Sequence, residues 1–156
     1  MPPQVIPLKM NSKKNISIVI PTYNEKENIQ RLIPNIEKVL SSNNIFADII
    51  IIDDNSPDGT GKLAEDLNKE YNNIKVVHRK KKEGVGSARR LGFSLASNEI
   101  IISMEGDNTH NPKYIPQFIE KIEEGADLVI GSRYLKDSKI PFPEVILLLR
   151  FQGRQK

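Results

Sequence analysis

Short runs of branched apolar residues alternate along the chain with longer segments in which apolar residues recur every three or four positions. Runs rich in Ile and Val and bounded by turn residues are typical of buried strands, whereas the second spacing places apolar side chains on one face of a helix. The runs predict five strands, at residues 16–20, 48–52, 74–78, 100–102 and 127–130. Four amphipathic helices are predicted between them. This alternation predicts an α/β fold with a mostly parallel sheet and helices on both faces.

Polar side chains gather directly after the predicted strands. Sheets of this kind bind ligands beyond the carboxyl ends of their strands, near a point where the strand order reverses. We therefore expect the polar residues at these ends to form one site. They are Tyr23 and Glu25 after the first strand, Asp53 and Asp54 after the second, Glu105 and Asp107 after the fourth, and Arg133 after the fifth.

The fourth strand runs into Glu105, Gly106 and Asp107, so it brings two carboxylates to one turn. Glycine between them lets the backbone bend tightly or approach a ligand closely. Mg²⁺ and Mn²⁺ take oxygen ligands and are commonly held by one or two carboxylates together with the phosphates of a substrate. The turn alone is equally consistent with a divalent-metal site and with a solvated acidic surface.

Composition narrows the class of protein. The chain has 156 residues, 38% of them hydrophobic, which predicts one globular domain. It has no cysteine, which excludes disulfides and thiolate chemistry and fits a cytoplasmic location. No apolar run approaches the ~20 residues of a membrane span, and the first residues lack a signal-peptide core. Residues 1–15 are predicted to be a flexible basic arm.

The net charge is only +3, but a basic cluster lies at residues 78–82. Such clusters suit nucleotide diphosphates, an anionic membrane surface or nucleic acid, although most are solvated surface, the interpretation we favour here. Nucleic-acid binding is the weakest hypothesis, because no aromatic residue interleaves the cluster and no binding motif accompanies it. We expect no nucleic-acid partner.

Five motifs occur in the order of a known family. They are Pro21-Thr22-Tyr23-Asn24-Glu25, IIIIDDNSPDGT at 49–60, GVGSARRLGF at 84–93, MEGDNTHNPKYIP at 104–116 and GSRY at 131–134. Together they resemble glycosyltransferase family 2, and within it the dolichol-phosphate mannosyltransferase type. The resemblance covers residues 16–134 and implies a Rossmann-like nucleotide-diphospho-sugar fold of the glycosyltransferase-A type. Residues 16–134 would then be the donor-binding catalytic domain.

The resemblance also implies roles for single residues. Glu105 and Asp107 stand where the family has its Asp-x-Asp motif for Mg²⁺ or Mn²⁺, and Asp107 and Arg133 would be catalytic, with Arg133 on the diphosphate. The remaining donor-binding positions would be Pro21, Tyr23, Glu25, Ile52, Asp53, Asp54, Gly106 and Thr109. An aromatic ring packs well on a base, and an arginine neutralises charge on a leaving diphosphate.

The implied reaction is an inverting transfer of a sugar, mannose by resemblance, from a nucleoside diphosphate sugar such as GDP-mannose to a polyisoprenyl (dolichyl) phosphate. The protein would associate peripherally with the cytosolic face of a membrane. Two departures from the family pattern bear on this expectation. Glu105 replaces the first Asp of the metal motif, and only about twenty residues follow GSRY. The tail at 135–156 therefore predicts a shortened acceptor-side region, and residues 145–149 are interpreted as the start of an interfacial helix or as a core helix.

Other hypotheses stay open. The short tail and Glu105 also fit a non-catalytic or incomplete nucleotide-sugar-binding module that needs a partner. A dinucleotide-dependent oxidoreductase is suggested by Gly84-x-Gly86, but Arg89 stands where a third glycine belongs and the pattern follows the third strand. His110 and Asp58 are expected to cap or pack locally.

Overall fold

The computed structural model describes residues 14–131 and, for the backbone only, residues 147–150. All five predicted strands form, and the helices lie between them where the apolar spacing places them. The elements are β1 Lys14–Thr22, α1 Lys26–Ser42, β2 Ile45–Asp53, α2 Thr60–Tyr71, β3 Ile74–His78, α3 Val85–Leu95, β4 Ile100–Ser103, the short 3₁₀ turn η1 Pro112–Tyr114, α4 Ile115–Glu123, β5 Leu128–Ile130 and β6 Leu147–Arg150. Arg133 lies outside the described residues.

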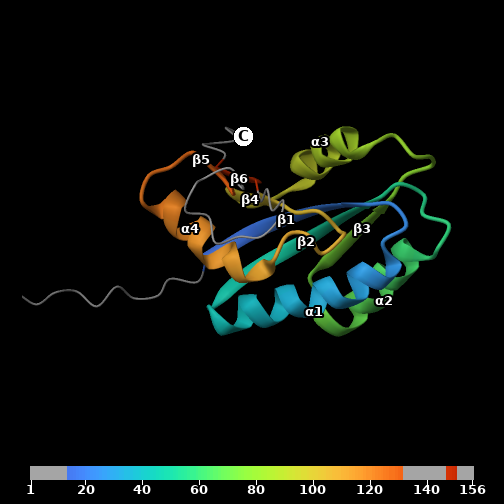
Figure 1. Cartoon of the computed structure of the whole chain (residues 1–156), viewed down its shortest axis with the longest axis horizontal. Coiled ribbons are helices and arrows are strands. Elements are labelled where there is room, and N and C mark those ends of the chain that lie inside the picture. The colour runs from blue at the N-terminus through green and yellow to red at the C-terminus, as the bar shows by residue number, and fades with distance from the viewer. Residues whose placement is uncertain (1–13, 132–146, 151–156) are drawn as a thin grey trace, which may run out of the picture.

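The strands form one sheet in the order β3-β2-β1-β4-β6-β5 (Figure 1). β1 pairs in parallel with β2 on one side and with β4 on the other, and β2 pairs in parallel with β3. The chain therefore leaves β1 toward one edge of the sheet and returns to its other side at β4. The carboxyl ends of β1, β2 and β4 meet at this reversal, which is where ligands bind in such sheets.

One prediction for the end of the chain is wrong. Within residues 145–149 the sequence favoured a helix, yet the described residues Leu147–Arg150 form β6, which pairs antiparallel with both β4 and β5. A short apolar run fits a strand between two neighbours as well as it fits a helical turn, and periodicity cannot separate the two. Without β6, one side of β4 would keep unpaired backbone groups.

The core lies on both faces of the sheet because successive side chains of a strand point to opposite sides. Ile16, Ile18 and Ile20 of β1 are fully buried in the larger cluster, beneath α1, α2 and α4. Val19 faces the other way and packs with Ile52 in a smaller cluster under α3. Figure 1 accordingly shows α3 on one side of the sheet and α1 with α2 on the other. The predicted two-faced α/β architecture is confirmed.

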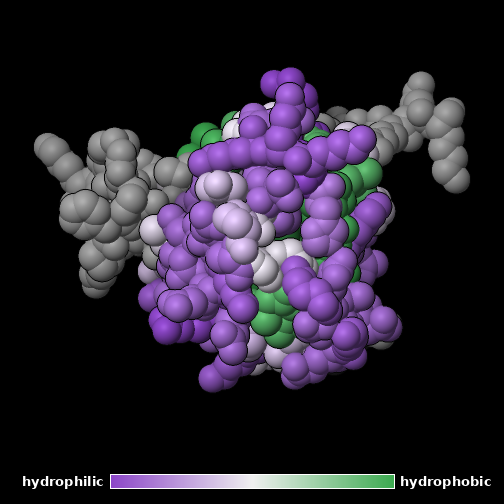
Figure 2. Space-filling view, turned by 90° about the vertical axis from the view of Figure 1, so that its right-hand side faces the viewer, coloured by the Kyte–Doolittle hydropathy of each residue, from purple (hydrophilic) through white to green (hydrophobic). Residues whose placement is uncertain are grey.

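The helix α3 lies unusually close to the sheet. A Cβ added to Gly92 would meet Val19 Cγ1 at 2.2 Å, so only glycine allows this contact. In the view of Figure 2 the surface is mostly hydrophilic, with small hydrophobic areas between the hydrophilic residues. Among the described residues, no helix is long and apolar enough to cross a bilayer.

Candidate functional site

The loops that follow β1 and β2 are joined by hydrogen bonds at the carboxyl edge of the sheet. Backbone amides at the start of α1 donate to side chains of the second loop. The pairs are Asn24 to Ser56 Oγ at 2.9 Å, Glu25 to Thr60 Oγ1 at 3.0 Å and Lys26 to Asp58 Oδ2 at 3.1 Å. The first amides of a helix have no partner within it, so the second loop caps α1. The expectation that Asp58 acts as a local capping residue is confirmed.

Asp53 is buried, and both oxygens of its carboxylate accept hydrogen bonds from the protein. It is 2% exposed and accepts hydrogen bonds from Thr22 Oγ1 at 2.9 Å and from the Ser56 amide at 3.0 Å. These bonds tie the end of β1 to the loop after β2. The contacts give Asp53 a positioning role at the edge of the candidate site.

Asp54 forms a buried ion pair with Arg79, which follows β3. The two side chains are 6% and 7% exposed. The other carboxylate oxygen accepts from the backbone amides of Glu83 at 3.1 Å and Gly84 at 3.0 Å. Asp54 therefore holds the loop between β3 and α3 against the end of β2. The interpretation of residues 78–82 as solvated surface is wrong for Arg79.

Four of the predicted donor-binding residues lie in different environments. Pro21 and Ile52 are buried, and the Ile52 side chain packs in the cluster under α3. Tyr23 is 37% exposed, and the ammonium group of Lys82 lies 3.9 Å from the centre of its ring. Glu25 is half-buried at the start of α1. Tyr23 and Glu25 are thus the members of this set whose side chains face the open edge.

The acidic turn, residues 105–107, packs directly on the end of β1. A Cβ on Gly106 would lie 3.2 Å from Thr22 Cγ2 and 3.5 Å from Glu25 Cγ, which is tighter than most real contacts for the first distance. Asp107 Oδ1 accepts from the Thr109 amide at 3.0 Å and from its hydroxyl at 2.6 Å. The turn therefore joins two predicted donor-binding positions, Gly106 and Thr109, to the β1 loop.

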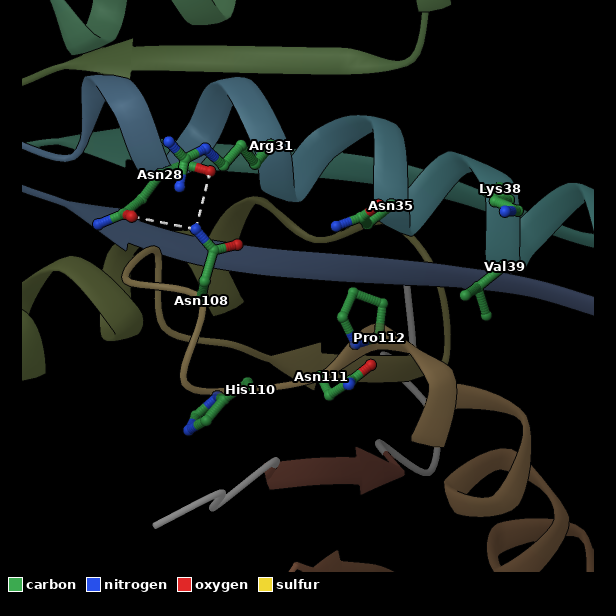
Figure 3. A pocket seen from close by; sticks show the side chains of 9 residues that line it. All are labelled: Asn28, Arg31, Asn35, Lys38, Val39, Asn108, His110, Asn111 and Pro112. Atoms are coloured by element: carbon green, nitrogen blue, oxygen red, sulfur yellow. Dashed lines mark hydrogen bonds between the residues drawn. The ribbon is translucent and has the colours of Figure 1, made fainter. Parts of the chain in front are cut away.

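Asn108 fastens the same turn to α1. It adopts a left-handed conformation with φ 63°, and its Nδ2 donates to both the backbone and the side-chain oxygen of Asn28 at 3.1 Å (Figure 3). Asn28 in turn donates to Glu25 Oε2 at 2.6 Å. This chain of amides connects the acidic turn to the first helical turn of α1.

Beside the hydrogen bonds between Asn108 and Asn28, a groove of about 570 Å³ runs between α1 and the segment after β4. Figure 3 shows side chains of α1 on one wall and residues 108–112 on the other. Its lining is Asn28, Arg31, Asn35, Lys38, Val39, Asn108, His110, Asn111 and Pro112. Neither carboxylate of the acidic turn lines the groove, so it is a neighbour of the candidate site and not its centre.

His110 binds the backbone of the acidic turn by a hydrogen bond. It is 3% exposed, and its Nδ1 accepts a hydrogen bond from the Glu105 amide at 2.9 Å. Because an amide can only donate, Nδ1 carries no proton. Burial lowers the pKa of His110 to about 4, with nearby Asp107 acting in the opposite direction and Arg89 acting in the same direction. His110 is neutral at pH 7, and its expected local packing role is confirmed.

Glu105 is paired with a cation from the opposite side of the sheet. Arg89 of α3 makes an ion pair with Glu105 Oε1, and the two side chains are 31% and 32% exposed. The turn therefore already contains one balanced charge. Asp107 has no cation paired with it among the described residues.

The acidic turn has the oxygen donors for a divalent cation that is coordinated partly by the protein and partly by a substrate. Glu105 and Asp107 offer hard oxygen donors, the type that Mg²⁺ and Mn²⁺ prefer. Within residues 14–131 no group of three or more acidic, His or Cys side chains could hold a metal ion by itself. The protein would supply two carboxylates, and phosphate oxygens and water would complete the coordination.

The structure adds two residues to the site that the sequence analysis did not place there, Arg79 and Arg89. They form ion pairs with Asp54 and Glu105, respectively. Arg79 directly follows β3, so its position at the same edge as Asp54 could have been inferred from the parallel sheet. No comparable signal existed for Arg89, because its contact depends on how closely α3 lies on β1.

Comparison with known proteins agrees with the motifs. The family model for glycosyl transferase family 2 matches residues 17–152. A dolichol-phosphate mannosyltransferase from Pyrococcus furiosus is 42% identical over 125 residues, covering 80% of this chain and 35% of that protein. A polyprenol monophosphomannose synthase from Mycolicibacterium smegmatis is 32% identical over 133 residues, covering 83% of this chain and 49% of that protein. The chain thus spans half or less of the length of these relatives.

The fold also matches solved structures. A mannosyltransferase from Pyrobaculum calidifontis, in complex with GDP-Man and Mn²⁺, aligns with a TM-score of 0.69 at 14% identity, covering 90% of this chain and 45% of that one. At this identity the likeness concerns the fold alone, which is of the glycosyltransferase-A type. The family model, the sequence relatives and the order of the five motifs lead to one conclusion: the chain belongs to glycosyl transferase family 2.

Proposed function

We propose that this chain carries the donor-binding half of a mannosyltransferase that uses GDP-mannose and a polyprenyl phosphate. The observation that carries the proposal is the convergence of the β1 loop, the β2 loop and the acidic turn at the point where the strand order reverses. Tyr23 and Glu25 would receive the nucleoside, and Glu105 and Asp107 would receive a divalent cation. The names of the two sequence relatives support this choice of sugar and acceptor, and the structural neighbour of the same fold was solved in complex with GDP-Man and Mn²⁺.

The metal, when bound, would neutralise charge on the diphosphate as it leaves. An oxygen of the acceptor phosphate would attack the anomeric carbon while the bond from that carbon to the diphosphate breaks, releasing GDP and inverting the configuration. Because the acceptor phosphate is already anionic, this step needs no general base. The residues of the chain would then act by positioning the substrates and stabilising the leaving group. Arg133, outside the described residues, remains our candidate for contact with the diphosphate.

A polyprenyl phosphate is a membrane lipid. The proposal therefore includes a peripheral position at the cytosolic face of a membrane. A second function, a donor-binding module without turnover, is motivated by Glu105, which replaces the first Asp of the metal motif and already pairs with Arg89. Both functions require the same donor site, so binding and transfer must be measured separately.

Calorimetry with GDP and with UDP, each with and without Mn²⁺, tests the donor site. We expect GDP to bind in a Mn²⁺-dependent manner, and the Asp107→Asn variant to lose this dependence. Asp127→Asn is the matched control, because it removes the same charge from an exposed turn before β5, at the opposite edge of the sheet. Mn²⁺-dependent binding that survives in Asp107→Asn would refute the metal assignment. Transfer of labelled mannose to a short polyprenyl phosphate then separates the enzyme from the non-catalytic module.

A further inference from the structure

Arg89 reaches Glu105 from the side of the sheet opposite to α1. The two residues are 16 positions apart, on α3 and in the turn after β4, and their side chains form an ion pair at the edge of the sheet. Both side chains are about one-third exposed, so the pair is reachable from solvent without being fully solvated. A carboxylate that the proposed function assigns to a metal ion is therefore occupied by a cation of the protein itself.

The position of Arg89 is fixed by the packing of its helix. Ala88, the preceding residue, is 1% exposed, and Gly92, one turn later, lies against Val19 of β1 with no room for a Cβ. The backbone of α3 at Arg89 cannot slide along the sheet without opening these contacts. The guanidinium group can rotate about its own side-chain bonds, but its starting point stays above the acidic turn.

The guanidinium group is only partly satisfied in this position. Its Nε is buried and has no hydrogen-bond partner among the described residues. A buried donor without an acceptor is costly, especially on a charged group. Burial also lowers the pKa of Arg89, although an arginine keeps its charge at any physiological pH. A further acceptor oxygen near Arg89 would therefore be stabilising, and phosphate oxygens, like carboxylate oxygens, fit the fork of an arginine well.

The ion pair and a metal ion exclude each other at Glu105. A divalent cation on the Glu105 carboxylate would bring two like-charged groups within a few ångströms of each other. Metal binding therefore requires the guanidinium group to leave the carboxylate. Once released, it needs a new anion nearby, and the diphosphate of a donor is an anion that arrives together with the metal.

We propose that Arg89 is the resident counter-ion of the acidic turn, which pairs with Glu105 until a metal ion and a nucleoside diphosphate displace it together. The inference rests on the proposed function. The ion pair would weaken the binding of metal alone and would couple the binding of the metal to the binding of the nucleotide. Coupling of this kind is reciprocal, so GDP must tighten Mn²⁺ binding by the same factor as Mn²⁺ tightens GDP binding.

The test compares Arg89→Met with Arg90→Met. Both remove one positive charge from α3, but Arg90 is exposed and makes no ion pair among the described contacts. Electron paramagnetic resonance of free Mn²⁺ would give the affinity for the metal alone, and calorimetry with GDP would give the coupling. We expect Mn²⁺ alone to bind about three- to tenfold more tightly to Arg89→Met, and to change by less than about twofold in Arg90→Met, since a partly exposed pair is worth little more than the surface value. The coupling factor should fall in Arg89→Met only.

Equal Mn²⁺ affinities in the two variants, or weaker binding in Arg89→Met, would overturn the inference. The proposed function fails separately: if Asp107→Asn binds Mn²⁺ as well as the unmodified chain does, the metal site itself is wrong. A measurement on the unmodified chain avoids any folding defect of a variant. The ¹⁵N-resolved Nε–Hε signal of Arg89, assigned from its absence in Arg89→Lys, should move when Mg²⁺ and GDP are added together. A signal that stays in place under saturating Mg²⁺ and GDP would also refute displacement.

Discussion

Replacing Gly92 with alanine should destabilise the protein because α3 touches the sheet at this residue. The added methyl group would lie 2.2 Å from Val19 Cγ1, 3.2 Å from Cγ2 and 3.3 Å from Cβ. Val19 is fully buried in β1, which is paired on both sides by β2 and β4. A β-branched side chain in such a strand has few alternative rotamers. Either Val19 must adopt a strained rotamer or α3 must move away from the sheet.

The size of the effect follows from two opposing contributions. Overpacking a well-packed core by a methyl group typically costs about 1–3 kcal/mol. Replacing glycine by alanine within a helix contributes up to about 1 kcal/mol in the opposite direction. Because the contact with Val19 Cγ1 would be as short as 2.2 Å, the overpacking cost should lie in the upper half of its range, and the net expected loss at Gly92 is about 1–2 kcal/mol. Gly86 provides the matched control, because it lies on the same helix and an added Cβ meets nothing within 4 Å. Gly86→Ala should leave stability unchanged or raise it by a few tenths of a kcal/mol.

Urea denaturation followed by circular dichroism measures both variants. We expect opposite shifts of the unfolding midpoint, with Gly92→Ala lower and Gly86→Ala equal or higher than the unmodified chain. If both variants shift in the same direction by similar amounts, helix propensity decides the outcome and the close contact between α3 and β1 is not rigid. That result would also mean that the packing of Gly92 does not fix the backbone of α3 at Arg89, one turn earlier.

Three further substitutions test contacts at the site. Burial lowers the pKa of His110 to about 4, so below pH 6.5 the native state binds fewer protons at this histidine than the unfolded chain does. The free energy of unfolding should therefore fall by up to about 3 kcal/mol between pH 6.5 and pH 4. In urea unfolding curves, His110→Asn should remove this contribution to the pH dependence. Asp58→Ala removes the acceptor for the Lys26 amide and should lower stability by about 1 kcal/mol in thermal unfolding. Arg79→Met leaves Asp54 buried without its partner and should cost about 3–5 kcal/mol. Replacing Asp54 by leucine as well should recover only part of this loss, because the amides of Glu83 and Gly84 then lose their acceptor.

Each of these has a contrary outcome. Identical pH profiles for the unmodified chain and His110→Asn would mean that the imidazole is protonated in the native state, which the hydrogen bond from the Glu105 amide forbids. An Asp58→Ala variant as stable as Asp127→Ala, an exposed carboxylate away from this edge, would show that capping by the β2 loop is not needed. Additive losses in the Arg79 and Asp54 double variant would show that the two residues are energetically independent.

Much of the fold could be predicted because the strands are unusually distinct. Buried runs such as residues 49–52 are almost pure isoleucine, and they are separated by segments with clear helical spacing. The exception is β6, whose position depends on its pairing with β4 and β5 and not on any local pattern. Pairing between distant segments leaves no periodic signal in a run of four residues.

The edge of the sheet that carries the candidate site could be predicted from the sequence, but the contacts between the side chains of the site could not. The edge on which Tyr23, Asp54 and Glu105 lie follows from the parallel sheet alone. The ion pairs do not. Arg79 directly follows β3, so its edge could be inferred, but its burial against Asp54 could not, because it stands in a run of basic residues that otherwise faces solvent. The pair of Arg89 with Glu105 depends on the approach of α3 to β1, which is set by tertiary packing.

The contacts of the acidic turn would make the proposed donor binding separable from the proposed sugar transfer. Gly106 packs on Thr22, Asn108 is held by Asn28, and Glu105 is held by Arg89 and His110. Among the residues that the structure describes, all of these partners lie between β1 and the start of η1. A metal ion is not needed to shape a turn that is already held at several points, so it can bind late, together with its nucleotide. A failure to transfer mannose would therefore leave the donor site standing, whereas a failure to bind GDP with Mn²⁺ would count directly against the geometry of this edge.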